Sequence, residues 1–483
     1  MLRTPQLGSD ARNLAARVVV RHSTLAVLLG AAGNLLGAEL RVPADYPTIR
    51  AAIDASVAGD VVLVSPGIYE GLGNRDLVLP DHDLTVEGEG AGATIECGSF
   101  PDQGNEHRGF DIQLPDESAA RIIVRNVEVR GGTGVIQAEF GGAAYVFGGG
   151  SIDFVGCRFV RNGLEQVTTW GGALAVGGPA RVTVRECTFR ENTSDSGHAI
   201  GMGGIGTLQV LNCRFQDNRG YATAAICTDG SRPGTTYIYG CVFENNWVGI
   251  AARIGGVTVE ECTFVANGSL RWGGAVEVGD DIEGGSAVVV IDDSVISANS
   301  ASSRGGGICV WAGELRMSRT ILFGNCLNNP PGMGRDLYVH GGSATLSCCC
   351  VSADGVAGEV TLDRCVRESP RFCEPPPCGV WDVNEELRLL PDSPCLAKNN
   401  LCGVDIGGAL GTCGSGPLGA CCLPEIGCVL RAEGDCLAAG GKFDGGAECL
   451  AETCAPPTAT ERTTWGRLKQ RYGSTGNQKS LRR

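Results

Sequence analysis

The residues best suited to chemistry in this sequence are acidic side chains that lie close together. Glu277, Asp280 and Asp281 form a dense group in the repeated part of the chain. Two carboxylates several ångströms apart can act as general acid and general base in glycoside hydrolysis, so these residues are catalytic candidates. Asp153 stands between two apolar residues and would therefore point out of a strand. The competing interpretation is that the dense group forms a solvated loop.

Aromatic residues offer a second kind of site. Trp170 and Trp272 could bind sugars by stacking, although they lie four coils apart in the repeat, which favours an interpretation as turn-shaping residues. No metal site is predicted, because the sequence has no Cys-x-x-Cys pair, no nearby pair of histidines and no column of aspartates. No cofactor is expected, and Ca²⁺ would be needed only if the protein were a polysaccharide lyase.

An internal repeat determines where these candidates lie. Seven six-residue segments align without gaps, each with Phe, Ile or Leu at the third position and asparagine at the sixth. Their spacing varies from 21 to 32 residues. The segments are Cys157–Asn162, Cys187–Asn192, Cys213–Asn218, Cys241–Asn246, Cys262–Asn267, Ser294–Asn299 and Thr320–Asn325.

Runs of alternating apolar and polar residues flank each segment, which predicts three short strands per repeat. A unit of three strands that winds once around a central core is one coil of a solenoid, and insertions in the loops explain the variable spacing. We therefore predict an all-β fold, a right-handed single-stranded parallel β-helix, over residues 39–415. A periodicity of 3.6 residues is absent, which argues against stacked helical hairpins.

Equivalent residues of successive coils should form columns. The phenylalanines from Phe159 to Phe264 should stack in the core at about 4.8 Å per coil, beside an inward column of cysteines that act as small apolar residues. The asparagines should form a hydrogen-bonded ladder at a sharp corner, because asparagine tolerates the left-handed conformation. The ladder residues are Asn162, Asn192, Asn218, Asn246, Asn267, Asn299 and Asn325.

The open N-terminal end of a solenoid needs a cover. The spacing of apolar residues predicts a short amphipathic capping helix over residues 48–57. Thr48 should be its N-cap, and Ile49, Ile53 and Val57 should form its buried face.

Three stretches resemble bacterial pectin-lyase-fold proteins with parallel β-helix repeats. VPADYPTI at 42–49 and GDVVLVSPGIY at 59–69 are similar to the opening of these proteins, and DIGGA at 405–409 is similar to their closing coil. The resemblance implies the fold but no single reaction, because the group includes lyases, hydrolases, esterases and adhesins. The segment around Asp153 also loosely resembles a pectin methylesterase segment that carries a catalytic aspartate, and this resemblance makes Asp153 a catalytic candidate, although the partner segments of that family are missing.

Cysteine usage changes towards the C-terminus. Ten cysteines lie from Cys326 to Cys413, where the coils should become irregular, and we expect disulfides that staple this region. Residues 416–455 contain six more cysteines and are too short to bury a sufficient core, so they should form a cysteine-rich module with three disulfides. Residues 456–483 are predicted to be a basic flexible tail.

Export is predicted from the N-terminus. Residues 1–38 have a basic leader, an apolar run and a final Gly-Ala pair, as a signal peptide does, so we expect a secreted or cell-surface protein. The formal net charge of the whole chain is −15, but both ends of the chain are basic. Residues 39–455 therefore carry a net charge of about −24. This charge makes nucleic acid an unexpected partner, and no stretch is long and apolar enough for a transmembrane span.

Two functions remain open. The first is a non-catalytic protein that binds a polysaccharide or cell-surface matrix, or that forms a structural scaffold. The second is an extracellular polysaccharide lyase or glycoside hydrolase that acts on the outer face of the β-helix. The missing catalytic motifs and the negative charge favour the first. The oligomeric state is open.

Overall fold

The computed structural model describes residues 37–412, with gaps, and three strands beyond them. The gaps are 91, 99–106, 135–139, 164–169, 221–222, 230–233, 280–286, 330–331, 374–375, 379–386 and 409. Residues 1–36 of the predicted signal peptide, the basic tail, and the candidates Asp280 and Asp281 lie outside the described residues.

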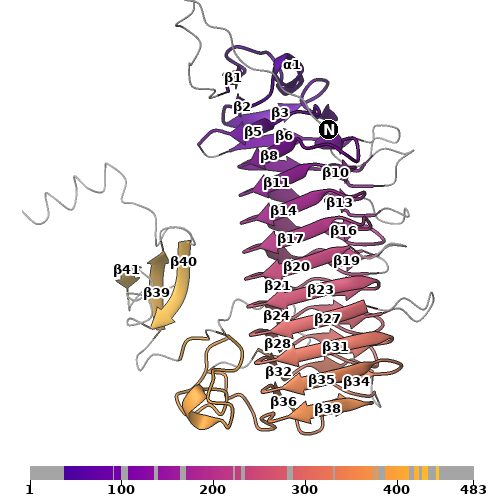
Figure 1. Ribbon diagram of the computed structural model, residues 1–483. Coiled ribbons are helices and arrows are strands. Elements are labelled where there is room, and N and C mark those ends of the chain that lie inside the picture. The colour runs from indigo at the N-terminus through magenta and orange to yellow at the C-terminus, as the bar shows by residue number, and fades with distance from the viewer. Residues whose placement is uncertain are drawn as a thin grey trace, which may run out of the picture.

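The chain winds as a parallel β-helix, and each complete coil gives one strand to each of three long parallel sheets (Figure 1). Sheet 1 contains, in hydrogen-bonded order, β1 (Glu39–Val42), β2 (Asp60–Val64), β5 (Leu84–Gly88), β8 (Arg121–Arg125), β11 (Ser151–Val155), β14 (Arg181–Arg185), β17 (Thr207–Leu211), β20 (Thr235–Tyr239), β23 (Gly255–Glu260), β27 (Ala287–Asp292), β31 (Gly313–Ser318), β35 (Ser343–Ser347) and β38 (Val360–Asp363).

Sheet 2 contains β3 (Gly67–Glu70), β6 (Ala93–Glu96), β9 (Val127–Arg130), β12 (Arg158–Val160), β15 (Thr188–Arg190), β18 (Arg214–Gln216), β21 (Val242–Glu244), β24 (Thr263–Val265), β28 (Val295–Ser297), β32 (Ile321–Leu322) and β36 (Cys350–Val351). Sheet 3 contains β4 (Leu77–Val78), β7 (Phe110–Gln113), β10 (Ala144–Phe147), β13 (Leu174–Val176), β16 (Ile200–Met202), β19 (Ile226–Thr228), β22 (Ile250–Ala252), β26 (Val276–Val278), β30 (Ile308–Val310), β34 (Leu337–Val339) and β37 (Val356–Ala357).

Two small sheets complete the strands. A parallel one is formed by β25 (Gly268–Ser269), β29 (Ser300–Ala301) and β33 (Cys326–Leu327). An antiparallel one lies in the predicted cysteine-rich region and is formed by β39 (Leu418–Leu423), β40 (Gly427–Ala432) and β41 (Lys442–Asp444). The predicted fold class is confirmed, and the solenoid stays regular further than expected, because β35 still pairs in parallel with β38.

Phenylalanine rings from successive coils stack through the core of the solenoid. Ring centroids from Phe159 to Phe264 lie 4.8, 4.8, 4.7 and 4.6 Å apart, with interplanar angles of 16° or less. The predicted stack is therefore confirmed. Smaller apolar residues continue the column in both directions, for example Val129 before it and Ile296 after it.

The seven asparagines that end the repeats are nearly or fully buried and are bonded from coil to coil. The Nδ2 of Asn192 donates to the Oδ1 of Asn218 on the next coil and to the carbonyl of Phe159 on the preceding coil, both at 2.9 Å. The backbone N–H of Asn192 donates to the same Oδ1 at 3.1 Å. The column ends at a buried carboxylate, because the Nδ2 of Asn325 donates to Asp336 at 2.9 Å.

The expectation that these asparagines adopt the left-handed conformation was wrong. The residue before each asparagine has the positive φ instead, for example 55° at Arg161 and 56° at Glu191. The corner is therefore turned one residue earlier, and this allows the asparagine side chain to point inward along the ladder.

The inward cysteines also form a bonded column. The thiol of Cys213 donates to the carbonyl of Leu211 at 3.3 Å and accepts from the backbone N–H of Cys187 at 3.4 Å. Ser294 and Thr320 take the same role with hydroxyl groups. These side chains therefore hydrogen-bond the backbone at the corner between sheets 1 and 2, in addition to filling space as small apolar residues.

A short helix, α1 (Ile49–Ala55), covers the first coils as predicted. The hydroxyl of its N-cap, Thr48, accepts a hydrogen bond from the N–H of Ala51 at 3.2 Å, and Ile49 and Ile53 are buried. Val57 does not join that face and is 65% exposed, because the helix ends two residues before it.

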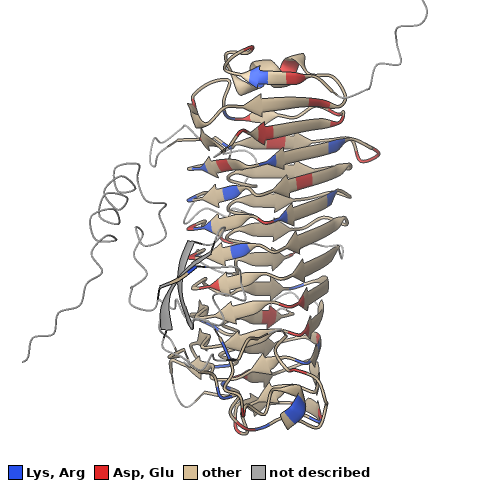
Figure 2. Cartoon of the chain, turned by 90° about the vertical axis from the view of Figure 1, so that its left-hand side faces the viewer, with Lys and Arg blue, Asp and Glu red and all other residues tan. Residues whose placement is uncertain are grey.

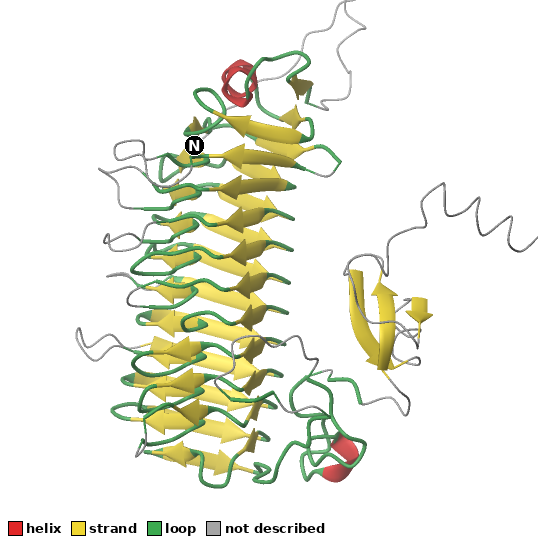
Figure 3. Ribbon diagram, turned by 180° about the vertical axis from the view of Figure 1, so that it is seen from behind, coloured by secondary structure: helices red, strands yellow, loops and turns green. Residues whose placement is uncertain are grey.

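At the C-terminal end, the described residues of 366–412, here called the lateral segment, turn back and pack beside the last coils (Figure 3). The outward residues of sheet 2 change with this cover. Arg158 and Arg214 are exposed on early coils, whereas Val295 and Ile321 at equivalent positions are buried against the lateral segment. Burial of these apolar residues stabilises the packing of the segment.

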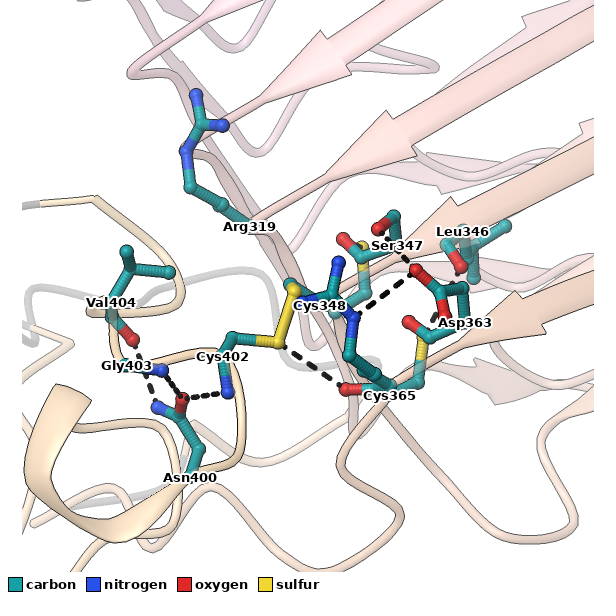
Figure 4. Close-up of a disulfide and its surroundings, with 12 residues drawn as sticks. Arg319, Leu346, Ser347, Cys348, Asp363, Cys365, Asn400, Cys402, Gly403 and Val404 are labelled. Atoms are coloured by element: carbon teal, nitrogen blue, oxygen red, sulfur yellow. Dashed lines mark hydrogen bonds and ion pairs between the residues drawn. A yellow bond between two sulfur atoms is a disulfide. The ribbon is translucent and has the colours of Figure 1, made fainter.

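Two disulfides fasten the lateral segment to the solenoid: Cys326–Cys378 and Cys348–Cys402. Figure 4 shows the second one, with Asn400 beside it, whose Oδ1 accepts from the N–H groups of Cys402 and Gly403 at 2.9 and 3.0 Å. The expectation of disulfides in this region is confirmed, but they join a lateral segment to regular coils and do not compensate for imperfect ones.

Candidate functional site

The tryptophans that the structure describes collect on one side of the solenoid. All four that the structure describes lie over the outer surface of sheet 3, carried by the connections that enter or leave its strands: Trp170, Trp247, Trp272 and Trp311. Tyr145, Phe147 and Tyr338 project from the same sheet, and Phe140 joins them from a neighbouring loop. We call this surface the aromatic face.

Small residues on sheet 3 make room for these rings. The outward column of the sheet has Ala175, Gly201, Cys227 and Ala251 on four successive coils. A Cβ atom at Gly201 would lie 3.1 Å from the indole of Trp170, so the ring rests directly on the backbone. Because these outward positions carry only short side chains or none, the rings can lie directly against the sheet.

One group of rings, the N-terminal cluster, surrounds β10. Its rings form a chain of contacts, with Phe140 5.6 Å from Tyr145 and 5.9 Å from Trp170, and Tyr145 6.1 Å from Phe147. Phe147 is 46% exposed and Phe140 is 38% exposed. Both rings therefore present apolar surface to solvent.

Polar groups border the N-terminal cluster. The guanidinium of Arg108 lies 5.2 Å from the ring centre of Tyr145 and 3.7 Å from the carboxylate of Asp111, and its burial lowers the pKa of Arg108. The amide of Gln113 donates to Asp111 at 2.9 Å. This border therefore offers a carboxylate and an amide beside the exposed rings.

A second group of rings, the C-terminal cluster, lies over β26, β30 and β34. Trp311 packs edge-on against Trp272, at 4.3 Å between ring centres, and 4.7 Å from His340. The guanidinium of Arg304 lies 5.7 Å from the ring of Trp311 and 5.3 Å from that of Tyr338. Arg271 lies over Trp272 at 4.3 Å in the same way. This cluster therefore combines rings with cations.

The acidic candidates are not brought together within the described residues. Asp153 points outward from β11 in sheet 1 and forms an ion pair with Arg121 at 3.0 Å. Glu277 lies on β26 in sheet 3, opposite Ala251 and Cys309. Because the two carboxylates belong to different sheets, they do not form an acid–base pair with each other.

Trp170 and Trp272 belong to the N-terminal and the C-terminal cluster, respectively. Sequence reasoning missed their companions, notably Tyr145, Phe147 and Trp311. A signal was available, because Tyr145 and Tyr338 stand in the same strand position as the small residues of the outward column.

Several cavities lie among the described residues. With volumes of about 320 to 490 Å³, they lie near the N-terminal helix, near the turns before sheet 1, including the turn that follows Phe147, and beside the Cys326–Cys378 disulfide. Figure 2 shows residues of both charges along the solenoid, and neighbouring coils form ion pairs, as Arg158 does with Glu128 at 2.8 Å. Such exposed pairs contribute little to stability.

In the part of the chain that the structure describes, no group of three or more His, Cys, Asp or Glu side chains could hold a metal ion. Within the same residues, no helix is long and apolar enough to cross a membrane.

Comparison with known proteins identifies the class of fold. Residues 180–351 match the family described as a right handed beta helix region, and the solenoid is accordingly a right-handed parallel β-helix. No curated protein sequence gives a significant match.

Three solved structures are similar to the chain. They are the catalytic unit of a thermostable GH87 alpha-1,3-glucanase from Streptomyces thermodiastaticus (19% identity, TM-score 0.38), the surface adhesin PfbA of Streptococcus pneumoniae (14%, 0.32) and tailspike protein 3 of bacteriophage CBA120 (12%, 0.30). The alignments cover 65%, 71% and 65% of this chain, and 64%, 94% and 56% of the other chains. The chain thus spans less than two thirds of the glucanase, and at these identities the similarity concerns the fold alone.

Proposed function

We propose that this protein is a secreted or cell-surface, non-catalytic β-helix protein that binds a glycan along the aromatic face. The observation that carries the proposal is the gathering of all four described tryptophans over one sheet, together with exposed Phe140 and Phe147. Aromatic rings bind the apolar faces of sugars while leaving the hydroxyls free to hydrogen-bond.

The form of the face favours a long ligand. Tyr145 and Tyr338 stand seven coils apart in the outward column of sheet 3, which corresponds to roughly 34 Å at 4.8 Å per coil. Trp247 lies between the two clusters, packed against Cys227 and Ala251. An extended chain that lies along the solenoid could therefore contact several rings in turn, and each contact would raise its avidity.

The non-catalytic assignment rests on the placement of the carboxylates. Asp153 pairs with Arg121 on sheet 1, whereas Glu277 lies on sheet 3, so these two carboxylates are not placed as an acid–base pair. Secretion is supported by the two disulfides and by the leader sequence, since disulfides persist in oxidising compartments.

The test is binding of the full chain to immobilised neutral and acidic polysaccharides. Phe147→Ala should weaken retention about fivefold, which corresponds to roughly 1 kcal/mol of lost stacking. Tyr239→Ala removes an aromatic ring from sheet 1, outside the aromatic face, and should leave retention unchanged. Equal effects of the two variants, or no retention on any glycan, would contradict the proposal. Release of new reducing ends or unsaturated products would instead support the lyase or hydrolase alternative.

A further inference from the structure

The two clusters of the aromatic face differ in the hydrogen-bonding groups they offer. The N-terminal cluster is bordered by the carboxylate of Asp111 and the amide of Gln113, and its arginine, Arg108, lies beside that carboxylate. These groups can accept hydrogen bonds from the hydroxyls of a neutral sugar.

The C-terminal cluster offers mainly donors. The guanidinium of Arg304 makes no hydrogen bond or ion pair with any residue in the described part of the chain, and it is held over two rings. The Nε1 of Trp311 also has no hydrogen-bond acceptor among the described residues, but Trp311 is only 9% exposed, so this donor lies beneath the surface and Arg304 is the group that can meet a ligand. Arg271 and the exposed imidazole of His340 belong to the same cluster. The neighbouring strand β26 contributes one described carboxylate to it, Glu277.

From this difference we infer that the C-terminal cluster is a subsite for a glycan that carries an acidic substituent, a carboxylate or a sulfate. A guanidinium presents a planar set of N–H donors that matches the oxygens of such groups. The rings of Trp311 and Tyr338 hold Arg304 without neutralising its charge. The inference rests on the proposed glycan-binding function and names the ligand class of one part of that face.

The negative charge of the whole chain limits which acidic ligands fit. Residues 39–455 carry about −24, which repels a polyanion at long range. A glycan with widely spaced acidic groups would meet less repulsion and could still place one group on Arg304. Its binding should weaken as salt rises, because salt screens the attraction between exposed charges.

The experiment uses the full chain on an array of matched oligosaccharides, each neutral member beside its carboxylated form and its sulfated form, with a chelator present. The acidic members should bind about tenfold tighter than their neutral partners. Arg304→Gln should abolish that preference, and Arg304→Lys, which keeps the charge, should retain part of it. Phe147→Ala should weaken neutral and acidic members alike, because it lies in the other cluster. The two acidic forms distinguish carboxylate from sulfate as the preferred group.

Retention of neutral glycans without an acidic preference would overturn this inference and leave the proposed function standing. An acidic preference that survives Arg304→Gln would also overturn it. If no glycan is retained, both proposals fail. An unchanged urea midpoint for Arg304→Gln would show that its effect on binding does not come from unfolding.

Discussion

The asparagine ladder provides a sharp test of what holds this solenoid together. The Oδ1 of Asn218 accepts from the backbone N–H of Asn192 at 3.1 Å and from its Nδ2 at 2.9 Å. The Nδ2 of Asn218 donates to the carbonyl of Phe189 and to the Oδ1 of Asn246, both at 2.9 Å. All of these groups are buried, so water cannot replace a lost partner.

Asn218→Ala should leave two buried donors of Asn192 without an acceptor. Each unsatisfied donor costs about 1–3 kcal/mol, so the free energy of unfolding should fall by roughly 2–6 kcal/mol. The matched control is Asn162→Ala at the start of the ladder. There one backbone donor depends on the side-chain oxygen, the N–H of Gly132 at 2.9 Å, and the expected loss is roughly 1–3 kcal/mol.

Urea unfolding of both variants measures the two losses, and native-state hydrogen exchange reports directly on the N–H of Asn192. That amide should exchange faster in Asn218→Ala and remain protected in Asn162→Ala. If the two variants were equally stable, or if Asn218→Ala lost less than about 1 kcal/mol, the ladder would contribute space-filling and not hydrogen bonding.

Three further predictions concern neighbouring features. Cys213→Ser should change the urea midpoint little because a hydroxyl keeps the bond to Cys187, whereas Cys213→Val should cost about 1 kcal/mol. Burial raises the pKa of Asp336, so the folded chain binds the proton of this carboxyl more tightly than the unfolded chain does. The stability that this group contributes is therefore lost as pH rises. Urea titrations should show Asp336→Asn to be more stable than the original chain at pH 7 but not at pH 3. Replacing Cys326 and Cys378 by serine opens a loop with a sequence separation of 52 and should lower the free energy of unfolding by about 4 kcal/mol, measured by denaturation without reductant.

Each of these has an outcome that contradicts it. A serine as damaging as valine at position 213 would show that the thiol acts only by its volume. A pH-independent difference between Asp336 and its asparagine variant would show that its carboxyl titrates alike in the folded and unfolded chains. An unchanged midpoint after loss of this disulfide would mean that the Cys348–Cys402 bridge and packing already hold the lateral segment without it.

The coils were predictable because structural columns repeat one residue type. Phenylalanine and asparagine recur at fixed positions, since each stacks on or bonds to its own kind on the next coil. The left-handed corner was placed one residue too late, because residues as different as Arg161 and Glu191 occupy it. Sequence alone does not reveal a position at which the backbone is constant and the side chain varies.

The aromatic face was only partly predictable, for a related reason. Trp170 and Trp272 were singled out by type, but their neighbours come from loops of different length, so spacing could not show that their rings meet. The lateral segment could be predicted more readily, because the outward positions of sheet 2 change from arginines on early coils to Val295 and Ile321 on late coils. A column that turns from charged to apolar indicates that something covers it.

The two disulfides also determine how the molecule would respond to a pulling force. A load applied between Cys402 and residue 412 passes through sulfur to Cys348, and a load applied at Cys378 passes to Cys326. The final strands β37 and β38 lie inside the loop that the Cys348–Cys402 bridge closes, so they carry no tension. The solenoid would therefore not peel away from its last coil, because the force enters several strands earlier, where sheets 1, 2 and 3 continue on both sides.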